Sequence, residues 1–171
     1  MNDTKSLRIR PAVLADLDII MGIFDHARSF MSSVGNPTQW INGYPQRELI
    51  ESEIVSGNCF VCVTPEDFLV ATFCFIVGDD PTYRHIEAGA WLNDKPYAVL
   101  HRLASDGTYT GIFDFCISWC FAHCQNLRVD THRDNLILQR LLLKHGFSYC
   151  GIIYVADGTP RMAFQCTLDN A

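Results

Sequence analysis

The sequence has 171 residues, of which 49% are hydrophobic and 19% charged, with a formal net charge of -6 at pH 7. An acidic chain without a basic stripe is not typical of a nucleic-acid binder, and no apolar run reaches the roughly 18–20 residues of a membrane span. The N-terminal residues MNDTKSLRIRP contain no apolar signal region. We therefore expect a cytoplasmic protein that binds neither nucleic acid nor membrane. The length predicts a single domain over residues 1–171, with its core over residues 7–168.

The spacing of apolar residues predicts the order strand, two helices, three strands, helix, strand, helix and two strands. The predicted strands cover residues 7–10, 59–63, 68–77, 97–104, 127–131, 148–155 and 161–168. The predicted helices cover residues 13–27, 45–56 and 112–123 and the stretch between Asn135 and Gly146. Residues 82–93 show no clean period.

The segment over residues 31–46 is rich in Ser, Gly, Asn and Pro, and it also contains Trp40 and Tyr44. Two large aromatic rings are unusual in a simple linker. Either they pack on the core, or they form the wall of a substrate pocket, since binding residues favour loops.

Eight cysteines could indicate disulfides or a metal site, but their positions favour neither. Without a secretory signal, a disulfide framework is not expected. Cys59 and Cys62 lie in a predicted strand, whose alternation points their side chains to opposite faces. Cys116, Cys120 and Cys124 recur every four residues on a predicted helix. We interpret those three as small buried apolar residues rather than as ligands of a soft metal, and we predict no metal site.

The stretch over residues 127–155 predicts a compact crossover unit of strand, polar corner, helix and strand. Asp134 or Asn135 can accept a hydrogen bond from the free N–H groups at the start of the helix. Gly146 follows the last helical residue and suits a left-handed C-terminal turn. The polar corner lies at the carboxyl end of a strand, where open sheets tend to bind ligands.

Two corners of this arrangement, together with the order of the elements, resemble the GCN5-related N-acetyltransferase (GNAT) superfamily over residues 7–168. In the first corner, the loop SDGTYTG of residues 105–111 joins a strand to a helix. In the second, Asn135 is followed by a helix and then by Gly146-Phe147. The tail from Tyr149 to Gln165 further resembles a bacterial subgroup of small acetyltransferases, as do the pair His101-Arg102 and the run from Thr131 to Asn135.

The resemblance implies an α/β (α+β) acyl-CoA N-acyltransferase fold, with a mixed central sheet of about seven strands flanked by about four helices. It also implies that acetyl-coenzyme A is the acyl donor. In the family, a loop of the form [Q/R]-x-x-G-x-[G/A] holds the pyrophosphate at a helix start. That motif maps onto residues 108–113, with Gly111 as its middle glycine, and the chain departs from it at Thr108 and Phe113. The Phe113 ring would either crowd the phosphate or point into the core.

The cofactor-binding residues implied by the resemblance come from a strand, a loop and the second corner. The strand residues would lie along the pantetheine arm, and Asn135 would bind the cofactor or the substrate. The full set is Leu103, Ala104, Thr108, Tyr109, Thr110, Gly111, Ile112, Phe113 and Asn135.

Three residues are candidates for proton transfer. His101 has an unperturbed pKa near neutrality, which suits a general base, although it could equally be anchored to a backbone carbonyl. Glu87 is a second candidate base, and Tyr97 could donate a proton or bind the substrate. The family's frequent proton-donating tyrosine falls on Leu142, which cannot donate a proton.

The resemblance implies an acetyl-CoA-dependent N-acetyltransferase that acts on a primary amine of a small molecule or peptide, by direct attack in a ternary complex. The alternative is a catalytically silent acyl-CoA-binding sensor of the same fold, because the chain departs from the family at Phe113 and Leu142. The fold would also allow a homodimer.

Overall fold

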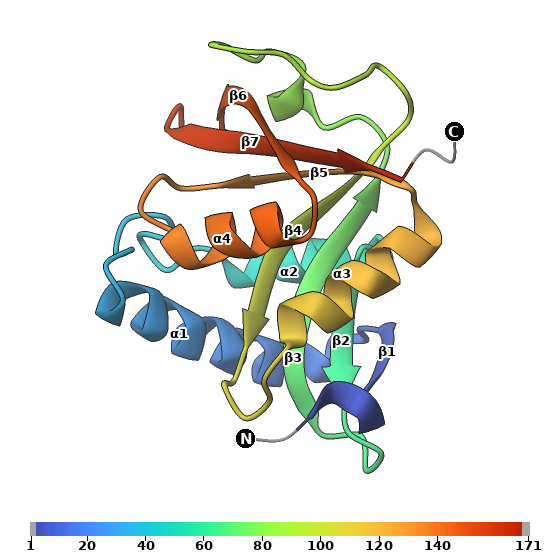
Figure 1. Ribbon diagram of the computed structural model, residues 1–171. Helices are drawn as coiled ribbons and strands as arrows, with labels where there is room; N and C mark the ends of the chain where they lie inside the picture. The colour runs from blue at the N-terminus through green and yellow to red at the C-terminus, as the bar shows by residue number, and fades with distance from the viewer. Residues whose placement is uncertain (1–2, 169–171) are drawn as a thin grey trace. The chain divides into compact units, whose positions relative to one another are not determined.

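The computed structural model describes residues 3–168 (Figure 1). Its seven strands are β1 (Arg8–Pro11), β2 (Cys59–Val63), β3 (Leu69–Val77), β4 (Ala98–Ser105), β5 (Asn126–Thr131), β6 (Ser148–Tyr154) and β7 (Pro160–Thr167). Its four α-helices are α1 (Leu17–Ser33), α2 (Arg47–Val55), α3 (Ile112–His123) and α4 (Leu136–Lys144). The predicted order of elements is confirmed, and most boundaries differ from the prediction by only one or two residues. The exception is α1, which starts later and ends later than the predicted helix.

The strands form one mixed sheet in the order β1-β2-β3-β4-β5-β7-β6. β4 and β5 are parallel, whereas β1–β2, β2–β3, β5–β7 and β6–β7 pair in antiparallel fashion. This sheet with its four helices confirms the predicted fold class. Within the described residues, no helix combines the length and apolar character needed to cross a membrane.

The chain divides into two compact units. Unit 1 consists of residues 3–75 and 101–117, and unit 2 of residues 76–100 and 118–168. The strands β3 and β4 and the helix α3 each contribute residues to both units. The single domain expected from the length stays a prediction.

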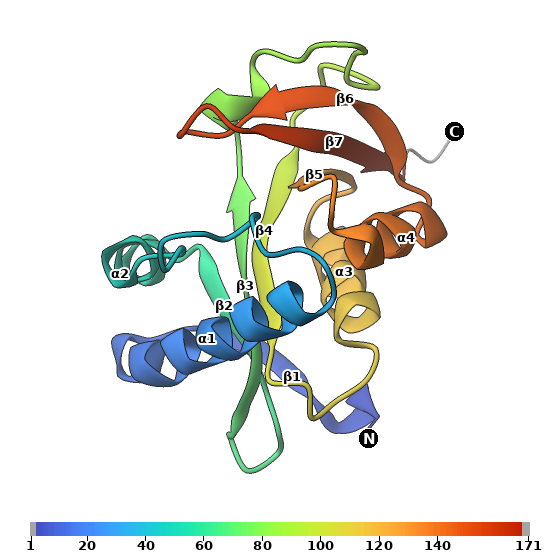
Figure 2. The ribbon, with the colours of Figure 1, turned by 90° about the vertical axis from the view of Figure 1, so that its left-hand side faces the viewer.

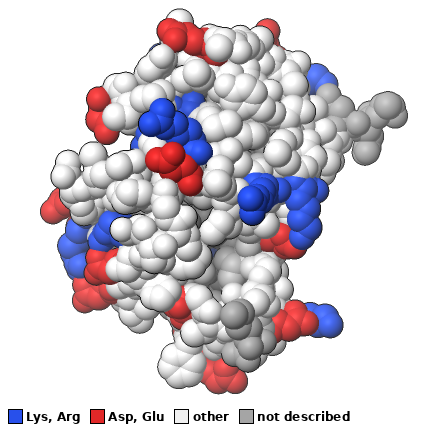
Figure 3. Space-filling view, turned by 60° about the vertical axis from the view of Figure 1, so that its left-hand side comes forward, with Lys and Arg blue, Asp and Glu red and all other residues white. Residues whose placement is uncertain are grey.

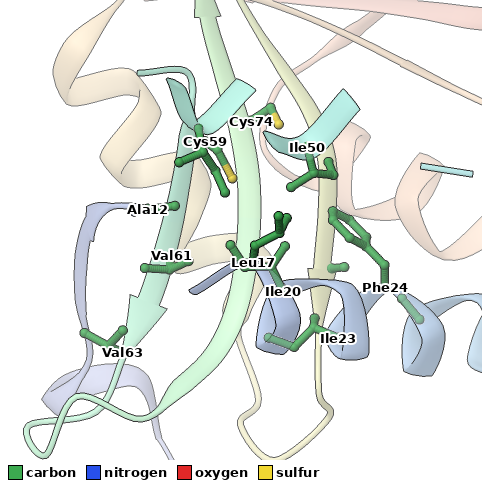
Figure 4. Packing of buried hydrophobic residues seen from close by; sticks show 13 residues of the cluster. Ala12, Leu17, Ile20, Ile23, Phe24, Ile50, Cys59, Val61, Val63 and Cys74 are labelled. Atoms are coloured by element: carbon green, nitrogen blue, oxygen red, sulfur yellow. The ribbon is translucent and has the colours of Figure 1, made fainter. Parts of the chain in front are cut away.

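Unit 1 has a hydrophobic core between the helices α1 and α2 and one face of its strands (Figures 2 and 4). From α1 and α2 come Leu17, Ile20, Ile23, Phe24, Ala27, Ile50 and Ile54, and from the strands come Cys59, Val61, Val63, Cys74 and Ala104. The α1 residues recur at the three- and four-residue spacing that places side chains on one helix face. The β2 residues alternate, as expected for a strand with one face on the core.

Asp16, the residue before α1, joins the turn that leads into this helix to β1. Its carboxylate accepts hydrogen bonds from the Val13 backbone N–H at 2.9 Å and from both terminal nitrogens of Arg10 at 2.8 and 3.1 Å. The hydrogen bond from Arg10 lowers the pKa of Asp16, although burial acts in the opposite direction. The carboxylate is therefore ionised at neutral pH, and it ties α1 to β1.

The predicted split of Cys59 and Cys62 is confirmed. Cys59 belongs to the core under α1 and α2, whereas the Cys62 Sγ lies 3.5 Å from the Sγ of Cys116 on α3. Cys116 and Cys120 are fully buried and Cys124 is half-buried. None of the eight cysteines forms a disulfide, and residues 3–168 contain no group of three or more His, Cys, Asp or Glu that could hold a metal ion.

Unit 2 has its own core, built around aromatic residues of the segment between β3 and β4. Tyr83, which is fully buried, packs against Trp91 and Tyr97 at ring-centroid distances of 5.2 and 6.3 Å. The Tyr83 hydroxyl donates a 2.6 Å hydrogen bond to Asp130 of β5. The region without a clean period thus consists of a short 3₁₀ turn, Pro81–Tyr83, and a segment tied to β6 through a bridge between Glu87 and Ile152.

The contact between this segment and β6 depends on two glycines. A Cβ atom at Gly89 would lie 2.0 Å from the Cys150 carbonyl oxygen, and one at Gly151 would lie 2.5 Å from the Glu87 carbonyl oxygen. Both neighbours are backbone atoms, which cannot move aside as a flexible side chain could. Two backbones can approach this closely only because both residues lack a side chain.

Gly89→Ala is therefore expected to destabilise the protein by about 1–3 kcal/mol, the cost of overpacking a tight contact. The matched control is Gly22→Ala in α1, where a Cβ would meet no atom within 4 Å. That change is expected to stabilise the protein by about 0.5–1 kcal/mol, because alanine favours a helix. Urea unfolding followed by circular dichroism measures both. Equal midpoints for the two variants would contradict the close approach.

Candidate functional site

The end of β4 that lies in unit 1 departs from regular strand geometry at Arg102. This residue has φ of 54°, a left-handed conformation that is uncommon for a side chain other than glycine. Its guanidinium Nε donates a 2.8 Å hydrogen bond to the Tyr44 hydroxyl, and one terminal nitrogen lies 3.3 Å from the Glu53 carboxylate. Residues held in such conformations tend to occur at functional sites, because the surroundings must stabilise the strain.

This contact also defines the loop between α1 and α2. Arg28 donates a 3.0 Å hydrogen bond to the Tyr44 carbonyl, while Arg102 binds the hydroxyl of the same residue. The Trp40 ring packs edge-on against Phe24 at 5.6 Å. The aromatic residues of this loop therefore pack on unit 1 and give the loop a fixed shape.

The residues next to Arg102 include the candidate base and the two strand residues assigned to the cofactor. His101 and Leu103 are half-buried. Ala104 is buried in the core under α1 and α2. Unit 1 thus brings His101, Leu103 and Ala104 into one strand segment, which continues directly into the loop over residues 106–111.

That loop is shaped by a local turn and a glycine. The Asp106 carboxylate accepts hydrogen bonds from the Thr108 backbone N–H at 2.9 Å and from the Thr108 hydroxyl at 2.6 Å. Gly111 has φ of 77°, and a Cβ there would meet no other atom within 4 Å. The helix α3 begins at the next residue, Ile112. A left-handed glycine with open space around it therefore stands directly before the first turn of a helix of twelve residues.

The side chains of Ile112 and Phe113 turn into the protein, with exposed fractions of 7% and 6%. Of the two alternatives left by the sequence, Phe113 thus points into the core and does not crowd the loop. Tyr109 is half-buried, and Thr108 and Thr110 are exposed. The positive end of a helix dipole and the N–H groups of a first helical turn favour phosphate. The residues present fit the pyrophosphate of a coenzyme A.

Glu87, the second candidate base, lies in unit 2. Its carboxylate is 3.0 Å from the His85 Nε2 and accepts a 2.9 Å hydrogen bond from the Tyr154 hydroxyl. These hydrogen bonds, first from His85 and then from Tyr154, lower the pKa of Glu87. The same carboxylate raises the pKa of Tyr154. Glu87 is therefore an exposed, ionised group at neutral pH.

Tyr97, the candidate acid, belongs to a different part of unit 2. Its hydroxyl accepts a 2.9 Å hydrogen bond from the Asp80 backbone N–H and lies 3.4 Å from an Asp79 carboxylate oxygen. The Arg128 guanidinium is sandwiched between the rings of Tyr97 and Trp91, at 3.9 and 4.2 Å. Desolvation lowers the pKa of Arg128. Glu87 and Tyr97 thus have separate sets of partners.

A cavity of about 310 Å³ adjoins Tyr97. It is lined by Gly78, Asp79, Asp94, Lys95, Pro96 and Tyr97. Its charged lining carries two carboxylates and one ammonium group.

Asn135 serves as the N-cap of α4, as the sequence predicts for Asp134 or Asn135. Its side-chain oxygen accepts a 3.1 Å hydrogen bond from the Leu138 backbone N–H. At the other end of α4, Gly146 has φ of 81°, the predicted left-handed turn. Leu142, at the position of the family's tyrosine, is fully buried. The assignment of Asn135 to cofactor binding stays a prediction beside this capping role.

Several residues of these sites were not singled out from the sequence. The sequence indicates Arg102 only as part of a resemblance, and it does not indicate a role for Arg128 or Tyr154. Arg102 carried one usable signal, because it lies within a strand beside a candidate catalytic histidine. Nothing in the sequence indicated the ring sandwich around Arg128, because its two aromatic partners lie more than thirty residues away along the chain.

Solved structures place this arrangement in a known family. The protein is similar to a GNAT-family acetyltransferase from Streptococcus agalactiae 2603, with a TM-score of 0.84 and 29% identity over 97% of this chain and 98% of that chain. It is also similar to a GNAT-family acetyltransferase from Listeria monocytogenes 4b F2365, with a TM-score of 0.71 and 19% identity over 95% of both chains.

A third similar structure, yncA from Salmonella typhimurium, was solved with its cofactor acetyl-CoA. It has a TM-score of 0.59 and 14% identity over 98% of this chain and 96% of that chain. Comparisons with protein-family models and with curated proteins gave no match.

The capping role of Asn135 can be separated from ligand binding by substitution. Asn135→Ala is expected to lower the free energy of unfolding by about 1 kcal/mol, because the Leu138 N–H loses its acceptor. Asn135→Asp keeps an acceptor for that N–H and is expected to retain stability near that of the wild type. Thermal unfolding measures both. Equal losses in the two variants would show that the hydrogen bond to Leu138 is not what stabilises α4.

Proposed function

Since the chain is a member of the GCN5-related N-acetyltransferase superfamily, we propose that it is an acetyl-CoA-dependent N-acetyltransferase. The acceptor is a primary amine of a small molecule or peptide. The amine attacks the thioester carbonyl directly while both substrates are bound. The observation that carries this proposal is the loop over residues 108–113, where a left-handed glycine precedes α3 and the two bulky side chains after it are buried.

The loop supports cofactor binding through its backbone rather than through side chains. The N–H groups at the start of α3 would hold the pyrophosphate. The strand residues Leu103 and Ala104 would pair with the pantetheine arm, and Asn135 is a further candidate for cofactor binding. The family's usual Gln or Arg is replaced by Thr108, whose hydroxyl is bonded to Asp106. Because the first contact is made by the backbone, this replacement leaves the phosphate site intact.

Acetyl transfer requires that the acceptor amine lose a proton and that the leaving thiolate be protonated or shielded. We assign the role of base to His101, directly or through a water molecule. Its position next to Arg102 and Leu103 supports this choice, since it belongs to the strand segment that leads to the loop over residues 108–113. Glu87 is ionised and exposed and is the second candidate for the base, and Tyr97 is the candidate acid.

The acceptor would meet the loop between α1 and α2, whose fixed shape comes from Arg28, Trp40, Tyr44 and Arg102. On the face drawn in Figure 3, acidic and basic side chains stand next to each other in small groups among uncharged ones. The net charge of -6 favours a cationic acceptor over an anionic one. A protonated amine is such a group.

One observation favours a second function, that of an acyl-CoA sensor without catalysis. Leu142 is fully buried at the position where the family often has a proton-donating tyrosine. A leucine in the core cannot protonate a thiolate. The two functions share the cofactor site and differ in whether acetyl-CoA is consumed when an amine is present.

Cofactor binding is tested by thermal unfolding in the presence of acetyl-CoA. At a concentration of about 100 Kd, the cofactor is expected to add about 2.7 kcal/mol to the free energy of unfolding. Gly111→Ala strains the left-handed position and is expected to weaken binding. The matched control is Gly158→Ala, which has φ of 82° and similarly open surroundings in the turn before β7. It is expected to cost similar stability without changing affinity. An unchanged melting temperature at saturating acetyl-CoA would contradict the proposal.

The role of His101 is tested by steady-state kinetics with an amine that supports thiol release. His101→Ala is expected to lower kcat by roughly 10²-fold or more, the usual effect of removing a general base, with little change in the Kd for acetyl-CoA. The control, His123→Ala, removes an exposed histidine at the end of α3 and is expected to leave kcat unchanged. If His101→Ala retains full turnover, the role of base passes to Glu87. If no amine yields free thiol from a cofactor-binding protein, the sensor function holds.

A further inference from the structure

Two buried cysteines of unit 1, Cys59 on β2 and Cys74 on β3, face the same core (Figure 4). They are directly opposite each other in the antiparallel register of the two strands. Their exposed fractions are 1% and 0%. The cofactor site described above uses neither of them.

Their position in the ladder brings the two backbones close together. The Phe75 N–H donates a 2.8 Å hydrogen bond to the Asn58 carbonyl, so the hydrogen-bonded positions flank the cysteines. Cys59 and Cys74 therefore occupy a non-hydrogen-bonded pair, in which Cα atoms lie about 4.5 Å apart. A disulfide joins Cα atoms about 4.4–6.8 Å apart. The two residues can be bridged without moving either strand far.

The surroundings of the pair are polar although it lies in a core. The Thr72 hydroxyl lies 3.7 Å from the Cys59 Sγ, and the positive charge of Arg102 acts on both thiols. The interaction between the two thiols lowers the pKa of Cys59, against the effect of burial, and raises the pKa of Cys74. A positively charged group beside a thiol favours the thiolate, which is the reactive form of cysteine.

We propose that Cys59 and Cys74 form a modification site at which a hydroperoxide oxidises the two thiols to a cross-strand disulfide. The Cys59 thiolate attacks one peroxide oxygen and breaks the O–O bond. The released hydroxide takes up a proton, which leaves a sulfenic acid on Cys59 and one water. The Cys74 sulfur then attacks the Cys59 sulfur, loses its own proton and expels the second hydroxide as water. Two thiols lose two electrons, and hydrogen peroxide becomes two waters.

The pair has polar side chains nearby that stay in partial contact with solvent. The Arg102 and Glu53 side chains each keep 14% of their surface exposed, so the cluster is not sealed by apolar groups alone. Hydrogen peroxide is uncharged and only slightly larger than water. Oxidation is therefore expected to be slower than at an exposed thiol and to depend on the local opening of unit 1.

A second pair of buried cysteines on the opposite face of β2 serves as an internal comparison for Cys59 and Cys74. The Cys62 and Cys116 sulfurs lie 3.5 Å apart and are also fully buried. This second pair joins a strand to a helix and does not have the cross-strand register of the first. Proximity of two buried sulfurs alone would predict oxidation of both pairs, whereas the cross-strand geometry and the neighbouring Arg102 predict oxidation at Cys59 and Cys74.

The test treats the reduced full chain with hydrogen peroxide, alkylates the remaining thiols and maps the peptides by mass spectrometry. The expected product has lost two of its eight alkylatable thiols, contains a peptide that joins Cys59 to Cys74, and reverts with dithiothreitol. Its urea midpoint is expected to rise on oxidation. The proposal is overturned if both cysteines remain alkylatable, or if only Cys62 and Cys116 are joined.

Two variants test the sulfenic acid intermediate and the choice of the cysteine pair. Cys74→Ser is expected to stop the reaction at the Cys59 sulfenic acid, which dimedone traps. Cys62→Ser removes one member of the comparison pair and is expected to leave the cross-strand disulfide unchanged. A dimedone adduct that is absent from Cys59 in the Cys74→Ser variant would also contradict the mechanism. If that variant does not fold, the peptide map of the wild-type chain decides the question alone.

Discussion

The hydrogen bond between the Arg102 guanidinium and the Tyr44 hydroxyl is the constraint on which the arrangement of unit 1 depends. It fixes a left-handed residue within β4, and it holds the loop between α1 and α2. Glu53 offsets the buried charge at 3.3 Å. Removal of one member of such a pair would leave the other desolvated and unpaired, which is costly. Arg102 thus lies beside His101 in β4 and binds the loop that would meet the acceptor. Its positive charge also acts on the cysteine pair.

The order of helices and strands could be predicted from the sequence because the signals for these elements are local. A continuous apolar run defined β2 to the residue, and the apolar run from Ile112 to His123 defined α3. The cap at Asn135 and the left-handed Gly146 are dictated by backbone chemistry at helix ends, so single residues reveal them. In contrast, the segment over residues 82–93 has no period because its order comes from contacts with β6 that are distant in sequence. Gly89 and Gly151 make those contacts possible, and the sequence does not indicate this role for either glycine.

The candidate site was predictable only in part, for the same physical reason. A glycine before a helix is visible in the sequence, and so is a histidine in a strand. Whether Phe113 blocks the phosphate position depends on where its side chain points. That orientation is set by packing in the core of the folded chain. The partners of Glu87 and the ring sandwich around Arg128 arise from tertiary contacts, and no spacing rule could have indicated them. The same holds for the pairing of Cys59 with Cys74 rather than with Cys62.

The proposed function depends most directly on the backbone at the start of α3, which would bind the pyrophosphate of acetyl-CoA. Amide hydrogen exchange, measured with and without saturating acetyl-CoA, tests it residue by residue. Slower exchange is expected at the amides of residues 110–114, where N–H groups would bind the phosphates, with unchanged exchange in the turn around Gly158. Slower exchange elsewhere, with none at the start of α3, would contradict it.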